Sequence, residues 1–524
     1  MSYSEAQYVI DEVLDGMPKG IQPQDMQEFS VSIGDGQAKL KFTEPLDTVI
    51  EGQRVCSVKG VKIVMKTGGY PQDENDGTLI MDNTELGKYS EEPYIIDDLT
   101  NDQEYFISAF PYSDNGYYNR SAALRTTEET YAQKNRAKFT PKAYILYGYR
   151  KAKNDSSPSA RITPLEQAVG MEKAYMDFED GTFHWGDWGN AFFLPKPYMV
   201  KSDGTLDYEL NHDDQTKKLD GQTESDISNT AYDGNAMAVF PTVWQYKYED
   251  ENYEYRYFCN IQLNDDYTAD MWTREDGTVE EWHALSMFDG GLVSGKLRSI
   301  AGVAPMASQQ AANEINYAEQ NGELWTTTAW SEWDTIASLL TLMGLSTDSQ
   351  SVYGYGVGQA SAAISTGSLK DKPMFYGRSE VQSKTTAVKV FYLENWWGNI
   401  WDRIQGCIAI NKSIRVKMKK PYNLTGTDYI NTGLTLAGTS GGYIDKTKTD
   451  NTYGTVPYNA SGSATTYEAD GLWFNNSAGT YVALVGGGWT NAAVCGCFAL
   501  LLYYAASTAY ATVGARLSCG QPAA

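Results

Sequence analysis

Alternation of apolar and polar residues is the clearest pattern in the first quarter of the chain. It runs through residues 37–45 and again through residues 60–68, as in strands that bury one face. The polar stretch that follows contains Asp76-Gly77, a hairpin-type turn signal. Residues 94–119 then read as strand, turn and strand. Short strands at this spacing predict a β-sandwich of about a hundred residues.

The predicted sandwich covers residues 32–127, and its pattern resembles a fibronectin type III or immunoglobulin-like module. Residues 1–31, which precede it, have a mixed pattern. We expect them to form an arm or attachment segment. A polar connector follows the sandwich.

The remaining chain is rich in aromatic residues and turns, and it holds one clear helix signal. Residues 331–344 place Ile336, Leu339, Leu340 and Met343 on one helical face. We expect Ser331 to cap this helix with Asp334 as its capping-box partner, and Gly344 to end it. Residues 424–465 are rich in Gly, Thr, Ser and Asn and predict loops and short strands. The expected fold class is mainly β with some α (α+β).

Composition supports a β-rich, loop-rich protein of several domains. The 524 residues include 38 Tyr, 13 Trp and 48 Gly, and one hydrophobic core rarely serves a chain this long. Forty-two basic residues against 67 acidic ones give a net charge of −25. Because phosphate backbones attract Lys and Arg, we expect no nucleic-acid partner.

Targeting and membrane signals are weak. The first twenty residues are acidic and lack the apolar centre of a signal peptide, so we expect synthesis in a cytoplasm and no Sec export. The apolar run from Ala492 to Ala506 is shorter than the roughly 20 residues that a spanning helix needs. We therefore expect no membrane insertion.

Metal and nucleotide motifs are absent from the pattern. The six cysteines show no zinc spacing and the three histidines lie far apart, so we expect no metal site and no cofactor. Gly354, Gly356 and Gly358 lack the spacing of a dinucleotide loop and open no helix.

Catalytic signals are equally weak. Cys495 and Cys497 would place both thiols on one face of a strand, but no nearby residue would lower their pKa, which favours a structural role. His184 and Asp187 lie in a Trp-rich stretch with no nucleophile nearby, and we expect His184 to be a packed core residue. No catalytic residue is expected.

The C-terminal segment, residues 486–517, combines two patterns. Phe498, Leu500 and Leu502 recur at period two, as in a strand with one buried face. Ala499, Leu501 and Tyr503 should therefore face the opposite way. After Tyr503 the segment consists mostly of Ala, Ser, Thr and Tyr.

This segment resembles the variable region of proteins diversified by retroelements in phages and bacteria, which begins with glycines and Trp and closes on Gly-Ala-Arg-Leu. In that family, codons for Asn-type positions are randomised at adenines. The resemblance implies these variable, ligand-binding positions: Ala493, Val494, Cys497, Ala499, Leu501, Tyr503, Tyr504, Thr508, Tyr510, Thr512 and Val513. It implies these scaffold positions: Trp489, Phe498, Leu500, Leu502, Gly514, Arg516 and Leu517.

The resemblance also implies a fold. Residues 390–406 and 471–489 are similar to the aromatic strands of a C-type-lectin fold in the form that resembles formylglycine-generating enzymes. We therefore expect residues 128–524 to be a C-type-lectin-like region. The earlier parts of the chain are similar to phage tail-fibre or tail-tip proteins.

The function implied is that of a phage-tail receptor-binding protein located in the virion. It would bind a bacterial surface receptor, protein or glycan, and would contact other tail proteins through its N-terminal region. Like tail fibres, it would be a homotrimer, and it would not be an enzyme. Two alternatives remain: a bacterial surface-display protein, which requires an export signal, and a formylglycine-generating-type oxidase that uses Cys495 and Cys497.

Overall fold

The computed structural model describes residues 22–50, 53–90, 92–120, 135–381 and 385–523. Strands predominate and helices are few, which confirms the mainly β prediction. The chain divides into two compact units, Met1–Ile145 and Leu146–Ala524. The predicted boundary at residues 127 and 128 therefore lies too early.

The smaller unit is a sandwich of two sheets. The first sheet has the strand order β1 (Glu28–Gly34), β2 (Gln37–Thr43), β7 (Tyr94–Ile96). The second has the order β6 (Thr78–Asn83), β5 (Val58–Lys66), β8 (Tyr105–Ser113), β9 (Arg136–Phe139), and a small hairpin adds β3 (Thr48–Ile50) and β4 (Gln53–Cys56). Leu40 and Phe42 of the first sheet share one core with Ile63 and Ile107 of the second.

Strands β2 and β5 confirm the two alternating patterns of the sequence. Two details of the prediction are wrong. The predicted arm includes β1, because residues 28–34 pair with β2; residues 1–21 of the arm lie outside the described residues. Strand β9 extends the sandwich past residue 127, because it completes the second sheet beside β8. The strand, turn and strand predicted over residues 94–119 include β7 and β8, which belong to different sheets.

The larger unit contains three main sheets. The four-stranded sheet has the order β11 (Ile162–Glu166), β10 (Leu146–Ala152), β18 (Tyr253–Cys259), β17 (Trp244–Glu249). The six-stranded sheet has the order β15 (Leu206–Glu209), β14 (Lys196–Lys201), β16 (Gly234–Pro241), β19 (Trp282–Ser286), β35 (Leu517–Gly520), β22 (Trp325–Thr327). Small hairpins are formed by β12 (Tyr175–Asp177) and β13 (Thr182–His184), β20 (Gly291–Val293) and β21 (Lys296–Arg298), and β23 (Lys389–Val390) and β24 (Leu393–Glu394).

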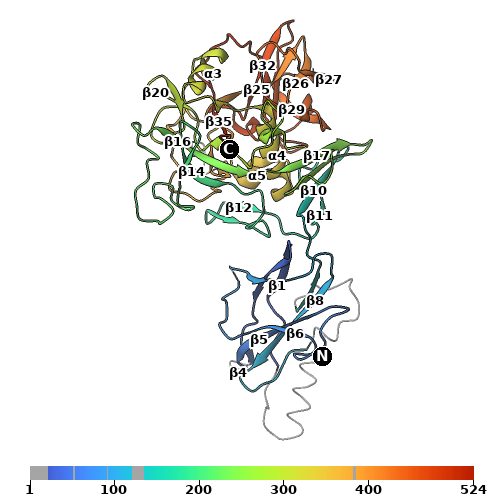
Figure 1. Ribbon diagram of the computed structural model, residues 1–524. Helices are drawn as coiled ribbons and strands as arrows, with labels where there is room; N and C mark the ends of the chain where they lie inside the picture. Colours follow the sequence, from blue (N-terminus) through green and yellow to red (C-terminus); the bar gives the residue numbers. More distant parts are fainter. Residues whose placement is uncertain (1–21, 51–52, 91, 121–134, 382–384, 524) are drawn as a thin grey trace. The chain divides into compact units, whose positions relative to one another are not determined.

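The ten-stranded sheet carries the C-terminal segment (Figure 1). Its order is β27 (Ile430–Thr435), β26 (Ser413–Val416), β25 (Trp401–Ile410), β32 (Thr480–Val485), β33 (Leu500–Leu502), β31 (Gly471–Phe474), β29 (Gly442–Asp450), β30 (Gly454–Gly462), β28 (Ala437–Gly438), with β34 (Val513–Gly514) beside β25. Two of these strands, β29 and β30, have nine residues each. The prediction of loops and short strands over 424–465 is therefore only partly right.

Helices are few in the described part of the larger unit: α3 (Ala311–Glu319), α4 (Trp330–Gly344) and α5 (Ser349–Tyr353), with 3₁₀ turns η1 (Asp270–Trp272) and η2 (Ala492–Val494). No helix among the residues described above has the length and apolar character needed to cross a membrane.

Helix α4 differs from its prediction in two ways. It starts at Trp330, and the Glu332 carboxylate accepts a hydrogen bond from the N-cap Ala329 N–H at 2.7 Å, so Ser331 is not the cap. All fifteen of its residues are buried, because its polar side chains have buried partners such as Arg256, which pairs with Asp334. The helix ends at Gly344, as predicted, and Leu345 takes the left-handed conformation at φ 47°.

Candidate ligand-binding surface

Strand β33 lies in the interior of the ten-stranded sheet. It pairs antiparallel with β32 and parallel with β31, and all three of its residues are buried. Leu501 and the preceding Ala499 belong to an apolar cluster with Trp401 and Leu484, whereas Leu500 and Leu502 do not. The alternation predicted from the sequence is thus present, but protein covers both faces of the strand.

Four of the predicted variable positions are therefore not displayed. Cys497, Ala499, Leu501 and Val513 are buried, with exposed fractions of 7% or less. The expectation that they face solvent is wrong, because Ala499, Leu501 and Val513 pack in an apolar cluster with residues such as Trp401 and Tyr429, and Cys497 is enclosed as well. Ala499, Leu501 and Val513 instead form part of the floor beneath the surface described next.

The chain leaves β33 after Leu502 and forms a loop over residues 503–512, which we call the displayed loop. None of its residues is buried, and Tyr503 and Tyr510 are exposed by 44% and 48%. Its sequence, YYAASTAYAT, has no charged side chain, although the whole protein carries a net charge of −25. The loop therefore presents a neutral aromatic surface on an acidic protein.

Carbonyl groups at every second residue of the displayed loop accept hydrogen bonds from outside the 486–517 segment. Four donors are main-chain N–H groups: Val482 to Tyr504 at 3.0 Å, and Ala311 to Ala506, Ser308 to Tyr510 and Trp401 to Thr512, each at 2.9 Å. The fifth is the Arg403 guanidinium, which donates to the Thr508 carbonyl at 2.9 Å and is held by buried Glu314 at 2.6 Å. A main-chain carbonyl is the same whatever side chain it carries. The path of the loop is thus fixed by groups that a side-chain substitution leaves unchanged.

Three tyrosines of the loop form a continuous aromatic group. The ring of Tyr504 lies 5.4 Å from that of Tyr503, at 80°, and 4.7 Å from that of Tyr510, at 41°. Tyr504 is half-buried against the apolar cluster below it. Burial and the neighbouring phenols raise the pKa of Tyr504, so its hydroxyl remains a hydrogen-bond donor at neutral pH. Tyrosines on a fixed backbone provide large contact areas at low entropic cost.

Trp473 of β31, which is not among the predicted variable positions, adds to this surface. It is half-buried, packs edge-on against Trp401 at 5.4 Å, and pairs with Leu501 across the sheet. Gly471 lies directly beneath it, because a side chain there would meet both the Trp473 ring and Val494. Val494 and Ala493 are half-buried on η2. The exposure of Trp473 follows from the fold, so the sequence alone carries no signal that identifies this position.

The predicted scaffold positions are mostly buried. Phe498, Leu500, Leu502 and Leu517 are buried, and Trp489 is half-buried with its main chain bonded to Asn399 and Ala360. Gly514 packs so closely that a Cβ atom there would lie 2.3 Å from the Met306 carbonyl oxygen. Only glycine fits at this position.

Arg516 anchors the end of the segment. Its guanidinium is buried and pairs with Asp402 and Asp289, each at 2.6 Å. It also donates to the Asn395 carbonyl at 2.8 Å, and the Trp396 ring lies 5.6 Å away. A buried charge needs partners of this kind, because it gives up its hydration.

The cysteines and the glycine loop have packing roles. Burial and the buried Asp470 carboxyl raise the pKa of Cys495 and of Cys497, so neither thiol is activated as a nucleophile. The six cysteines are all buried and unpaired. Gly354, Gly356 and Gly358 each approach the main chain of another segment closely.

His184 is exposed, which corrects the expectation of a packed core residue. Its ring stacks on Tyr175, and its charged neighbour is Asp177 rather than Asp187. Asp187 instead accepts a hydrogen bond from the Glu172 N–H at 2.7 Å. His184 and Asp187 are thus close in the sequence, but the acidic neighbour of His184 in the structure is Asp177.

Comparison with known proteins adds no assignment: no protein-family model matches the chain, and no curated protein matches it.

Proposed function

We propose that this chain is a receptor-binding protein of a phage tail and that its displayed loop binds a molecule on the surface of a bacterial host. The observation that carries the proposal is the carbonyl anchoring of residues 503–512, which fixes the loop through groups shared by all amino acids. Such a loop can change its side chains without changing its path. A retroelement-diversified variable region requires this property, because each new copy must still fold.

The ligand would contact Tyr503, Tyr504 and Tyr510, with Trp473 and Val494 beside them. Tyr-rich surfaces on rigid elements give useful affinity at one site, and repeated copies on a particle increase it through avidity. Thr508 and Thr512 would add hydroxyl groups to the same surface. Ala499, Leu501, Cys497 and Val513 would act through the shape of the floor rather than by direct contact.

The finer fold assignments are part of the proposal. The smaller unit would be an Ig/fibronectin-III-like module, which its sheets of three and four strands with one core support. The larger unit would carry a C-type-lectin-like domain that ends in the 486–517 segment. The protein would assemble as a homotrimer in the virion, attach to other tail proteins through its N-terminal region, and catalyse no reaction.

A cell-binding experiment tests the proposed receptor function. The labelled full-length protein is mixed with a panel of bacterial strains, and a strain that retains it is used to compare the variants. We expect Tyr503→Asn with Tyr510→Asn to lower retention at least tenfold. Tyr117→Asn, which changes an exposed tyrosine of the smaller unit, is the matched control. Equal retention of all three proteins, or retention by no strain, would contradict the proposal.

The neighbouring DNA tests the proposed diversification separately. We expect a near-copy of the codons for residues 486–517 that differs at adenines, together with a reverse-transcriptase gene. A locus with neither feature would argue against diversification and would leave receptor binding to the cell experiment.

A further inference from the structure

The hairpin of β12 and β13 has one face toward the protein and one toward solvent. Its register pairs Tyr175 with His184 and Met176 with Phe183. Met176 is buried, and the Phe183 ring stacks on that of Phe375 at 4.2 Å and 6°. The hairpin is thus anchored by its inner face. Its outer face carries Asp177 and His184.

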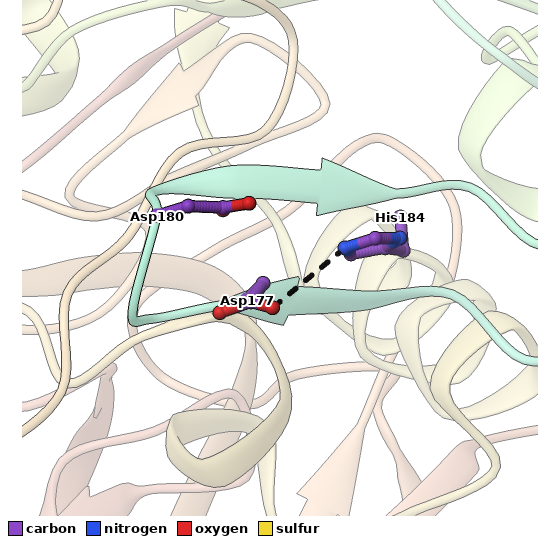
Figure 2. A group of neighbouring side chains, drawn as sticks. All are labelled: Asp177, Asp180 and His184. Carbon is purple, nitrogen blue, oxygen red and sulfur yellow. Dashed lines mark ion pairs between the residues drawn. The ribbon is translucent and has the colours of Figure 1, made fainter.

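Three potential metal ligands converge on this outer face (Figure 2). One ligand atom from each of Asp177, Asp180 and His184 lies within 4.8 Å of the other two. The His184 Nε2 and Asp177 Oδ2 atoms are 3.9 Å apart, which is too long for a hydrogen bond. These atoms therefore face one another without bonding directly.

Each ligand is oriented by a neighbour. One carboxylate oxygen of Asp177 accepts a hydrogen bond from the Glu179 N–H at 2.8 Å, and one of Asp180 accepts a hydrogen bond from the Thr182 N–H at 2.7 Å. The second oxygen of each carboxylate is the candidate metal ligand. The His184 ring lies flat against Tyr175, with centroids 4.8 Å apart at 12°. Outer contacts of this kind fix the ligands of protein metal sites.

A cleft beside the hairpin is an independent feature of this region. It has a volume of about 610 Å³, and Tyr175, Met176 and Phe178 form part of its wall. Lys173 and Asp348 also line it. Clefts of this size commonly hold small ligands. Tyr175 thus contacts both the cleft and the imidazole of His184.

We propose that Asp177, Asp180 and His184 bind one divalent transition-metal ion, such as Zn²⁺, at the edge of this cleft. One imidazole nitrogen and two carboxylate oxygens suit Zn²⁺, Co²⁺ or Mn²⁺, whereas Ca²⁺ takes six to eight oxygen ligands. Because the side chains are exposed, the remaining coordination positions are open to water or to a donor atom of a ligand in the cleft. The site is separate from the displayed loop and does not depend on the proposed receptor function.

Metal titration of the untagged full-length protein tests this proposal. Zn²⁺ binding is followed by calorimetry, and Co²⁺ binding by the visible absorption that coordinated cobalt gives. We expect one ion per chain, and at least tenfold weaker binding in both His184→Ala and Asp177→Asn. His212→Ala is the matched control, because His212 is the other exposed histidine and pairs with a single carboxylate, Glu209, at 2.7 Å.

The proposal would be overturned by Zn²⁺ binding no tighter than millimolar, or by binding that His184→Ala leaves unchanged. Equal losses in His212→Ala and His184→Ala, or tighter binding of Ca²⁺ than of Zn²⁺, would also overturn it. Circular dichroism of each variant checks the fold, which substitutions of these exposed residues should leave intact.

Discussion

Two parts of the C-terminal end of the chain have opposite surroundings. Residues 495–502 and 513–520, which we call the framework segments, are buried throughout, whereas no residue of the displayed loop between them is buried. Leu501 and Tyr503 are two residues apart, yet one packs in the core and the other is 44% exposed. Display is therefore decided by where the chain leaves the sheet, and not by the alternation of side chains along it.

The framework segments hold their place through side chains, and the displayed loop through its carbonyl groups. Arg516 and Gly514 are specified by their own contacts, a buried ion-pair network and a space too small for a Cβ atom. Tyr503 and Tyr510 are specified by no comparable contact. Substitutions of Arg516 or Gly514 should therefore lower the free energy of unfolding strongly, and substitutions of Tyr503 or Tyr510 should hardly change it.

Stability can be measured on the larger unit alone, because all thirteen tryptophans lie at or after residue 185. Tryptophan fluorescence during urea unfolding then reports this unit.

The largest effect is expected for Arg516→Met. It leaves the buried carboxylates of Asp289 and Asp402 without their cation, which should lower the free energy of unfolding by about 5 kcal/mol. The measurement is urea unfolding by fluorescence, with Lys196→Met, which changes an exposed cation of the larger unit, as the control. An unchanged unfolding midpoint would mean that the framework does not depend on this network.

Leu501→Asn should have the next largest effect. The substitution removes apolar contacts and buries an amide, so we expect a loss of about 4 kcal/mol. Tyr503→Asn, two residues away, should cost less than about 0.5 kcal/mol. Similar unfolding curves for the two variants would contradict the difference between the framework segments and the displayed loop.

High pH should weaken the framework through His283. Burial by itself lowers the pKa of His283, but hydrogen bonds to Glu280 and Glu332 outweigh burial and raise it to about 9. The stabilisation that follows from this shift, about 3 kcal/mol, is fully present below about pH 6.5, the pKa of His283 in the unfolded chain. It is lost as the pH rises through 9. Ser518 of β35 lies 2.9 Å from the same imidazole, so the effect reaches a framework segment.

Unfolding measured at pH 6 to 10 checks this expectation. The wild type should lose stability across that range, and His283→Gln should start lower and show a flatter profile. An equal slope in the variant would assign the pH dependence to other groups.

A smaller effect is expected for Arg403→Lys. Lysine keeps a positive charge near Glu314 but cannot also reach the Thr508 carbonyl with a planar guanidinium. We expect a loss of about 1–2 kcal/mol, and faster hydrogen exchange or proteolysis confined to the displayed loop. Faster exchange spread evenly through β25 and β32 would show that Arg403 supports the sheet rather than the loop.

The alternation of side chains along single strands could be predicted from the sequence, but which strand faces are buried could not. The period-two alternation of β2, β5 and residues 498–502 is present in the structure. What the pattern could not reveal is that Ala499 and Leu501 pack into an apolar cluster with residues from distant parts of the chain, such as Trp401 and Tyr429.

The hairpin of β17 and β18 also shows that alternation alone does not decide which face of a strand is buried. Its tyrosines alternate with charged residues, and the charged residues are the buried ones: Lys247 pairs with Asp270 at 2.7 Å, and Arg256 pairs with Asp334. Alternation gives two faces, but partners elsewhere in the chain decide which face is inside. Asp177, Asp180 and His184 likewise converge only because a hairpin brings them together.

The most direct test of the account replaces three side chains of the displayed loop at once and compares the result with three floor positions. Tyr503→Asn, Thr508→Asn and Tyr510→Asn together should leave the urea-unfolding free energy of the larger unit within about 1 kcal/mol of wild type. Ala499→Asn, Leu501→Asn and Val513→Asn together should leave that unit unfolded. Comparable destabilisation by the two triple variants would contradict the claim that main-chain anchoring frees the displayed side chains to change.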